Sequence, residues 1–340
     1  MLEHGGRLRR AAHDYGIPEA EWLDLSTGIN PDMYPVPPID PLAWQRLPED
    51  DDGLEAAAAA YYGSDRLLAL PGSQAAIQSL PQLFRPMTVA CVAPLYAEHP
   101  HAWERAGHTL RRLPSLSRAL AAATPAVLLC NPNNPTAECV PRTQLLDAAG
   151  QLRRRGGWLI VDEAFGDPAP ENTLTALAGS DTAPNLIVLR SLGKFFGLAG
   201  ARVGFVFAAA DELERLREMI GPWSVARPSR DVARQALTDT VWQDMAREKL
   251  MAASARLAKM LAPLGTVRRT ALFCTVGGGD APLPTTALAD HFARRAILVR
   301  RFDADGLLRF GLPGDEAGWR RLETAVRRQG TGNRGAAIGV

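Results

Sequence analysis

Lysine is nearly absent from this sequence. Of its 38 lysine and arginine residues, only three are lysine: Lys194, Lys249 and Lys259. Such a chain is expected to keep lysine mainly where arginine cannot replace it. One such role is a Schiff base, which a desolvated lysine amine can form. Lys249 and Lys259 lie in a charged stretch with a helical pattern, where a solvated lysine is a sufficient explanation. Lys194 lies between an apolar run and a Gly-rich segment, so it is the candidate for covalent chemistry.

The sequence also lacks an excess of either charge, a long apolar run and paired cysteines. A net charge of +1 gives no electrostatic reason to expect nucleic acid or an anionic membrane as a partner. No apolar run is long enough to span a bilayer, and the N-terminus lacks the apolar core of a signal peptide. The four cysteines form no C-x-x-C pair, so we expect no metal site and, except at Cys139, buried free thiols. A cytoplasmic protein of enzyme size fits this composition best.

The 340 residues are enough for two lobes, and a hydrophobic content of 46% is typical of a globular protein with a sizeable core. Short apolar strands alternate with helical patterns, which predicts an α/β fold with a mainly parallel sheet and helices on both faces. The expected strands are 67–70, 89–92, 127–130, 158–162, 186–190 and 203–208. We divide the chain into an N-terminal arm (1–50), a large domain (51–225), a small α+β domain (226–330) and a frayed tail (331–340).

Two motifs that follow expected strands could hold a ligand. Pro71-Gly72-Ser73-Gln74 is a small-residue turn at the start of a helix, where free backbone N–H groups and the Ser73 hydroxyl could bind a phosphate. An ordinary helix cap is the simpler alternative. The sequence NPNNPT at 131–136 is a turn in which two prolines fix the positions of asparagine side chains, and this pattern is rare by chance.

Two further motifs carry charged groups. Asp162 ends the apolar strand WLIV, and a carboxylate buried there needs a cation or a hydrogen-bond donor. A pyridinium nitrogen would supply both, although an aspartate that caps a helix is the alternative. Ser191 comes three residues before Lys194 and Arg202 eight residues after it. This hydroxyl and guanidinium are suitable ligands for a cofactor phosphate beside a Schiff base.

The order of these motifs resembles that of fold type I pyridoxal-phosphate enzymes. The resemblance covers about residues 1–330 and includes Tyr96, the NPNNPT turn, Asp162 and S-x-x-K with an arginine eight residues later. It is closest to the branch that contains histidinol-phosphate aminotransferase and L-threonine-O-3-phosphate decarboxylase. It implies an aminotransferase-like fold with a large domain and a small α+β domain, pyridoxal 5'-phosphate as cofactor, and a homodimer.

The resemblance also implies a role for each matching residue. Lys194 would hold the cofactor as a Schiff base and transfer a proton at Cα, and Asp162 would keep the pyridine nitrogen protonated. Tyr96 would stack on the ring and Asn134 would hydrogen-bond its O3′. The remaining implied cofactor-binding residues are Ser73, Gln74, Ser191 and Arg202. The implied substrate-binding residues are His4, Gly5, Asn30, Asn134, Arg300 and Arg309.

Several short elements favour the decarboxylase within this branch. They are HGG from His4, INP from Ile29, PWSV from Pro222, and Phe165, where aminotransferases of the branch usually carry tyrosine. Two arginines suit a substrate with a carboxylate and a phosphate, although a surface ion pair would also explain either one alone. The implied reaction converts L-threonine O-3-phosphate, a small phosphorylated amino acid, to (R)-1-amino-2-propanol O-2-phosphate and CO2 in cobalamin biosynthesis.

Three positions depart from the family pattern, and two alternative functions remain open. Gly193 replaces the usual Ser or Thr, Leu47 replaces a Tyr that reaches the partner subunit's cofactor, and Gly28 replaces a substrate-contacting Asn. An aminotransferase of the histidinol-phosphate type would share every cofactor residue and break Cα–H instead. A non-catalytic pyridoxal-phosphate-binding regulator would share the fold, but such proteins usually carry an N-terminal DNA-binding domain.

Overall fold

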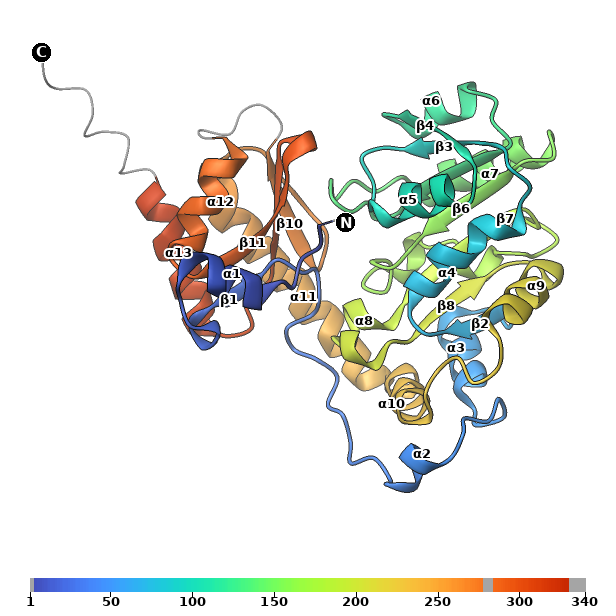
Figure 1. Ribbon diagram of the computed structural model, residues 1–340, viewed down its shortest axis with the longest axis horizontal. Coiled ribbons are helices and arrows are strands. Elements are labelled where there is room, and N and C mark those ends of the chain that lie inside the picture. The colour runs from blue at the N-terminus through green and yellow to red at the C-terminus, as the bar shows by residue number, and fades with distance from the viewer. Residues whose placement is uncertain (1–2, 278–283, 330–340) are drawn as a thin grey trace, which may run out of the picture. The chain divides into compact units, whose positions relative to one another are not determined.

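The computed structural model describes residues 3–277 and 284–329, which form two units (Figure 1). The larger unit consists of Met33–Asn134 and Glu138–Arg247, and the smaller of Met1–Asp32, Pro135–Ala137 and Glu248–Val340. Within the described ranges, no helix is both long enough and apolar enough to cross a membrane. The predicted tail at 331–340 lies outside the described residues.

The larger unit is built on a seven-stranded sheet. In spatial order its strands are β2 (Leu67–Leu70), β8 (Gly204–Phe207), β7 (Leu186–Ser191), β6 (Trp158–Asp162), β5 (Ala126–Cys130), β3 (Thr88–Val92) and β4 (Thr109–Leu113). Only β8 runs antiparallel to its neighbours. The predicted mainly parallel α/β sheet is therefore confirmed. The sequence did not predict β4, because this edge strand is half exposed and carries only two apolar residues.

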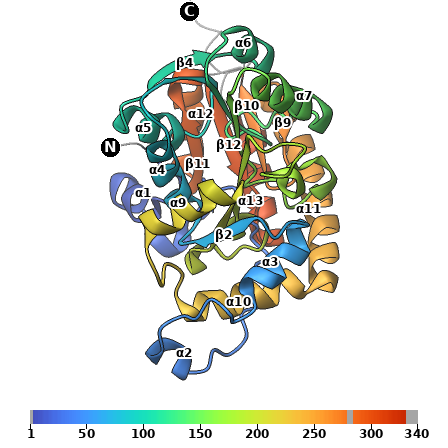
Figure 2. The ribbon, with the colours of Figure 1, turned by 90° about the vertical axis from the view of Figure 1, so that its right-hand side faces the viewer.

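Helices cover both faces of this sheet (Figure 2). One face packs against α4 (Ser73–Ser79), α5 (Glu98–Arg105) and α9 (Ala210–Ile220), and buries alternate strand residues with Trp103 and Leu216. The opposite face carries α3 (Leu54–Tyr62) and α7 (Arg142–Arg153), and Tyr62 contacts the rings of Phe205 and Phe207. Because helices cover both faces, the central strands are runs of apolar residues, and β6 and β7 become polar only at their carboxyl ends.

The register of three parallel strands aligns the predicted motifs. Cys130 at the end of β5 pairs with Asp162 at the end of β6, and Asp162 pairs with Leu189 near the end of β7. The NPNNPT turn, the segment after Asp162 and the segment that contains Lys194 therefore all leave the same edge of the sheet. This carboxyl edge is where open α/β sheets bind their ligands.

The smaller unit contains a five-stranded sheet in the order β1 (Leu23–Leu25), β11 (Ile297–Phe302), β12 (Leu307–Gly311), β10 (Phe273–Gly277) and β9 (Val267–Arg269). Its other elements are α1 (Leu8–Tyr15), α12 (Thr285–Ala293), α13 (Glu316–Gln329) and the end of α11 (Thr240–Leu261). The α+β character expected for this part of the chain is present.

This division differs from the expected boundaries at 50 and 225. The first part of the expected arm joins the smaller unit, because β1 pairs with β11 and because Ala11 and Trp22 pack against Ala293. The second boundary falls inside α11, after Arg247. Prolines do separate α9 from α10 (Arg227–Thr238), but α10 still belongs to the larger unit because Arg230 forms ion pairs with α3 and the turn before it.

Candidate active site

Ser73, Ser191 and Arg202 gather around a turn lined by two glycines. Gly72 has a φ of 78°, and a Cβ atom there would overlap the Arg202 guanidinium. Gly204 pairs with Ser191 across β7 and β8, and a Cβ atom there would overlap the backbone nitrogen of Ser73. Two hydroxyls, a guanidinium and the N–H groups at the start of α4 therefore lie close together, which is a suitable arrangement for a phosphate.

Gln74 and Tyr96 belong to a network that ties α4 to the segment before α5. The Tyr96 hydroxyl donates to Gln74 Oε1 over 3.5 Å, and Gln74 Nε2 donates to Glu98 Oε2 over 2.9 Å. Gln78, one turn further along α4, donates to the same carboxylate. This network fixes the position of the predicted stacking ring relative to the phosphate turn.

Asp162 is buried, and its carboxylate is held from two sides. Its Oδ2 lies 2.8 Å from His99 Nε2, and its Oδ1 accepts a hydrogen bond of 2.9 Å from the Ala164 backbone. His99 is itself only 1% exposed. His99 was not among the predicted site residues, because its partner Asp162 lies 63 residues further along the chain. The structure assigns it to orienting Asp162, because a buried carboxylate needs such a partner.

His99, Asp162 and Cys130 are the one group of metal-type ligands found close together in the described ranges, with their ligand atoms within 4.8 Å. Two of the three already form a hydrogen bond. Burial, and after it the charge of Asp162, raises the pKa of the Cys130 thiol well above its usual range. A thiol must lose its proton to bind a metal well, so this group is a poor metal site. The expected absence of a metal stays a prediction.

Lys194 lies on α8 (Leu192–Phe195), directly after β7. Its Nζ is 5.8 Å from the centre of the Phe165 ring. At the neighbouring Gly193, where the resemblance leads us to expect Ser or Thr, a Cβ atom would lie 2.9 Å from the Cα of Ala199. Lys249, by contrast, forms a surface ion pair with Asp32 and is 67% exposed. This agrees with the solvated role expected for Lys249.

Two asparagines of the NPNNPT turn form hydrogen bonds with backbone groups. Asn131 exchanges two hydrogen bonds with the backbone of Val140, and Asn133 donates to the Pro94 carbonyl over 2.7 Å. Asn134, the predicted ligand of the turn, is also buried. The turn is therefore fixed by its own hydrogen bonds, which is the condition for a ligand residue with a defined position.

The residues of the larger unit fit pyridoxal phosphate. They include a buried carboxylate for the pyridine nitrogen, an amine at the end of a strand, and a glycine-lined turn with hydroxyl and guanidinium groups for the phosphate. All eight predicted cofactor residues belong to this unit. Their individual roles remain predictions.

The predicted substrate residues other than Asn134 lie in the smaller unit. Arg309 is buried, donates to the Ser26 carbonyl over 2.9 Å and lies over the rings of Phe273 and Phe302. Arg300 pairs with Arg309 across β11 and β12 and donates to the Glu3 carbonyl. A hollow of about 210 Å³ is lined by His4, Gly5, Ser26 and Arg300, among others.

The structure supports Asn30 less well as a ligand. Its Oδ1 accepts a hydrogen bond of 3.0 Å from the Asp32 backbone, and the residue is only 3% exposed. This is an Asx turn, a local structure that an asparagine at this position explains without a ligand. His4, Gly5 and Arg300 are brought together around the hollow, whereas Asn30 does not line it.

Comparisons with known proteins define first a class and then a family. The profile of the family "Aminotransferase class I and II" matches residues 47–326. Threonine-phosphate decarboxylase of Pseudomonas aeruginosa is 50% identical over 96% of this chain and 97% of its own length. The enzyme of the same name from Sinorhizobium sp is 39% identical over 96% and 98%.

The solved structure of L-threonine-O-3-phosphate decarboxylase from Porphyromonas gingivalis has the same fold. Its TM-score is 0.76 at 20% identity, with 90% of this chain and 99% of that chain covered. The chain therefore belongs to the threonine-phosphate decarboxylases within the class I and II aminotransferase family.

Proposed function

We propose that this protein is a pyridoxal-phosphate-dependent enzyme that decarboxylates L-threonine O-3-phosphate. The products are CO2 and (R)-1-amino-2-propanol O-2-phosphate, a building block for cobalamin. The observation that carries the proposal is the 50% identity with a threonine-phosphate decarboxylase over nearly the full length of both chains. The gathered cofactor residues of the larger unit support it independently.

The cofactor, when bound, supplies an electron sink for the electron pair left at Cα after the carboxylate leaves. Asp162, oriented by His99, would keep a proton on the pyridine nitrogen and so maintain this sink. Lys194 would hold the cofactor and would return a proton to Cα. Ser73, Ser191 and Arg202 would bind the cofactor phosphate.

The two arginines of the smaller unit bind the anionic groups of the substrate. Arg309 and Arg300 suit a carboxylate and a phosphate because guanidinium groups bind both with paired hydrogen bonds. The orientation that Arg309 and Arg300 would give the substrate would determine which bond of Cα breaks. Substrate orientation, and not the cofactor residues, therefore decides between loss of CO2 and transamination.

Incubation of the cofactor-loaded protein with L-threonine O-3-phosphate, with and without 2-oxoglutarate, tests the proposal. We expect CO2 release that does not require the oxo acid, and an aminopropanol phosphate product identified by mass. A keto product formed only with 2-oxoglutarate, from this or another phosphorylated amine, would assign the protein to the alternative, an aminotransferase of the histidinol-phosphate type.

We also propose that the protein acts as a cytoplasmic homodimer. The region of α2 (Leu42–Gln45) exposes Leu42, Trp44 and Leu47 by 56%, 71% and 60%, which is typical of a surface that another chain covers. Four free cysteines, three of them buried, fit a reducing compartment. Sedimentation equilibrium of the wild type and of Trp44→Glu tests the dimer: we expect a dimer that the charge weakens, and a wild-type monomer would contradict it.

A further inference from the structure

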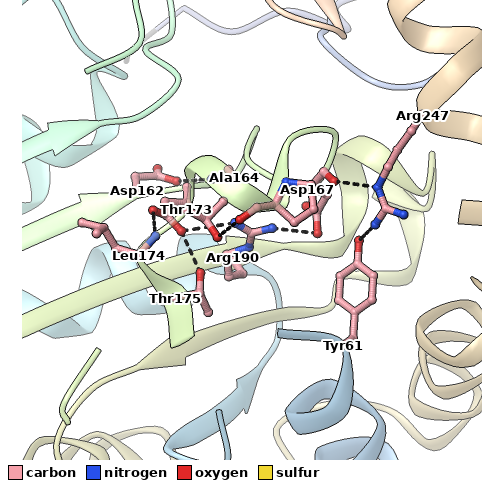
Figure 3. Close-up of polar contacts among 11 residues, drawn as sticks. Tyr61, Asp162, Ala164, Asp167, Thr173, Leu174, Thr175, Arg190 and Arg247 are labelled. Carbon is pink, nitrogen blue, oxygen red and sulfur yellow. Dashed lines mark hydrogen bonds and ion pairs between the residues drawn. The ribbon is translucent and has the colours of Figure 1, made fainter. Parts of the chain in front are cut away.

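A buried ionic cluster joins the ends of β6 and β7. Arg190 Nη1 lies 3.2 Å from Glu163 Oε2, and Arg190 Nη2 lies 2.9 Å from Asp167 Oδ1 (Figure 3). The side chains of both acids are 0% exposed and that of Arg190 is 2% exposed. The desolvation of buried ions largely cancels their attraction, so such a cluster is a weak source of stability and is better explained by the geometry that it fixes.

Each acid of the cluster is also held by another part of the larger unit. Glu163 accepts hydrogen bonds of 2.7 Å from both the Leu174 backbone and the Thr175 hydroxyl. Arg247 donates to the backbone carbonyl of Asp167 and to the Tyr61 hydroxyl (Figure 3). Burial raises the pKa of Glu163, and the charge of Arg190 offsets only part of this effect.

The cluster is directly connected to the predicted cofactor residues. Glu163 follows Asp162, and Arg190 precedes Ser191 on the strand that leads to Lys194. Between Glu163 and Asp167 lies Phe165, whose ring faces the Lys194 amine. One guanidinium thus binds both ends of the segment that carries Phe165, and Arg190 itself belongs to β7, the strand directly before Lys194.

Gly166 lies directly beside the Arg190 guanidinium. A Cβ atom at Gly166 would overlap Arg190 Nη1 and lie 2.9 Å from Thr173 Cγ2. The segment can therefore pass close to the guanidinium only because residue 166 has no side chain. This close approach supports a fixed distance between the segment and β7.

We propose that Arg190 is a positioning residue that, through Glu163 and Asp167, sets the places of Asp162 and Phe165 relative to Lys194. The proposal rests on the proposed function in that it assumes pyridoxal phosphate as the cofactor. It predicts that the cluster controls how tightly the cofactor is held and how readily the cofactor-bound Lys194 nitrogen takes up a proton. Neither property requires a substrate.

The larger unit offers a matched control in a second arginine with two acids. Arg230 binds Asp52 and Glu55, with closest distances of 2.6 Å in both ion pairs. Its side chain is 4% exposed, close to the value for Arg190, and the cluster joins α10 to α3 and the turn before it. No predicted cofactor residue is next to it in sequence.

The experiment compares Arg190→Met, Glu163→Gln and Asp167→Asn with Arg230→Met and Asp52→Asn. For each variant, the apo protein is titrated with pyridoxal phosphate, the absorbance of the bound cofactor is followed against pH, and the unfolding temperature is measured. We expect the first three variants to bind the cofactor at least about tenfold more weakly and to shift the midpoint of the pH titration. The two controls should lose unfolding temperature but keep the wild-type affinity and midpoint.

Several outcomes would overturn the proposal. If the Arg190-cluster variants keep wild-type affinity and midpoint, or if the Arg230-cluster variants change both to the same extent, Arg190 has no positioning role. If Arg190→Met does not fold, the result for Asp167→Asn decides whether Arg190 has a positioning role. This variant keeps the side-chain shape at position 167 and the charges of Arg190 and Glu163. Failure of the decarboxylase assignment can be distinguished from failure of the Arg190 proposal. If the protein is not a decarboxylase, cofactor binding would stay intact and only the product assay would change. A wild-type protein that binds no pyridoxal phosphate would overturn both.

Discussion

In the larger unit, several polar residues of the site are held by other side chains. Asp162 binds His99, Gln74 binds Glu98, and Arg190 binds Glu163. In the smaller unit, the predicted substrate arginines donate to backbone carbonyl groups of the N-terminal segment, namely those of Ser26 and Glu3, and Arg300 also lies 3.9 Å from the Glu3 carboxylate. These are two different ways to fix a charged group.

This difference has a physical consequence for cofactor binding and for substrate binding. A network of charged side chains fixes geometry and tunes charge together, so a single change propagates to its neighbours. A backbone carbonyl holds a guanidinium without adding a negative charge, so the contact of Arg309 with Ser26 does not neutralise the cation that an anionic substrate needs. We therefore expect changes in the larger unit to alter cofactor binding, and changes in the smaller unit to alter substrate binding alone.

Lys194→Ala is expected to have the largest effect. It removes the amine that binds the cofactor covalently, so turnover should fall by roughly a thousandfold or more and the absorbance of the bound cofactor should change. Spectra and CO2 release measure both properties. The matched control is Lys249→Ala, whose surface ion pair is worth little, and it should behave as the wild type. Full turnover in Lys194→Ala would remove the central assignment.

Arg309→Lys should come next and should separate the two units. A lysine keeps the charge but loses the paired hydrogen bonds and the stacking between Phe273 and Phe302. We expect kcat/KM for the phosphorylated substrate to fall about a hundredfold, or ~2.7 kcal/mol. Cofactor affinity, measured in the same preparation, should stay at the wild-type value. A parallel loss of cofactor affinity would break the comparison between the units.

Gly204→Ala should have a smaller effect, and on the cofactor alone. The new methyl group would overlap the Ser73 nitrogen and push the phosphate turn away from β8. We expect pyridoxal phosphate to bind about tenfold more weakly, with little change in the substrate KM once the cofactor is saturating. Gly200→Ala is the control, since a Cβ atom there meets nothing within 4 Å. Equal effects of the two substitutions would argue against the phosphate turn.

The smallest expected effect concerns the alkylation of cysteine thiols. The same measurement compares the stability of the two units. Burial raises the pKa of both Cys91 in the larger unit and Cys274 in the smaller unit to about 12. Near pH 8 both should therefore stay protonated and resist alkylation in the folded protein, while the exposed Cys139 reacts. Peptide mapping after alkylation in increasing urea would show which unit opens first. Rapid labelling of either buried thiol without denaturant would contradict this burial.

Much of the larger unit could be predicted from local sequence, because its strands are short apolar runs that end at polar motifs. The runs that became β6 and β7 each stop at a residue of the site, Asp162 and Ser191, so their carboxyl ends were recognisable before the fold was known. β1 could not be found in the same way. It is only three residues long, and its partner β11 lies far away in the chain.

The residues that the sequence analysis missed share one property: their partners are distant in sequence. His99 meets Asp162 across 63 residues, and Arg190 meets Glu163 across 27. An arginine or histidine has no local pattern that reveals whether it will be buried beside a carboxylate. The individual roles of the predicted site residues also stay predictions.

Residue type and spacing along the chain were enough to indicate the α/β class, the candidate lysine for covalent chemistry and the order of the motifs, because these features are local to the sequence. Only the tertiary structure decided that His99 orients Asp162, that one guanidinium binds both ends of the segment after β6, and that the N-terminal segment supplies the carbonyl groups that hold Arg300 and Arg309. These contacts join residues far apart in the chain, and such a contact forms only when the packing of the core brings its partners together and excludes water from them.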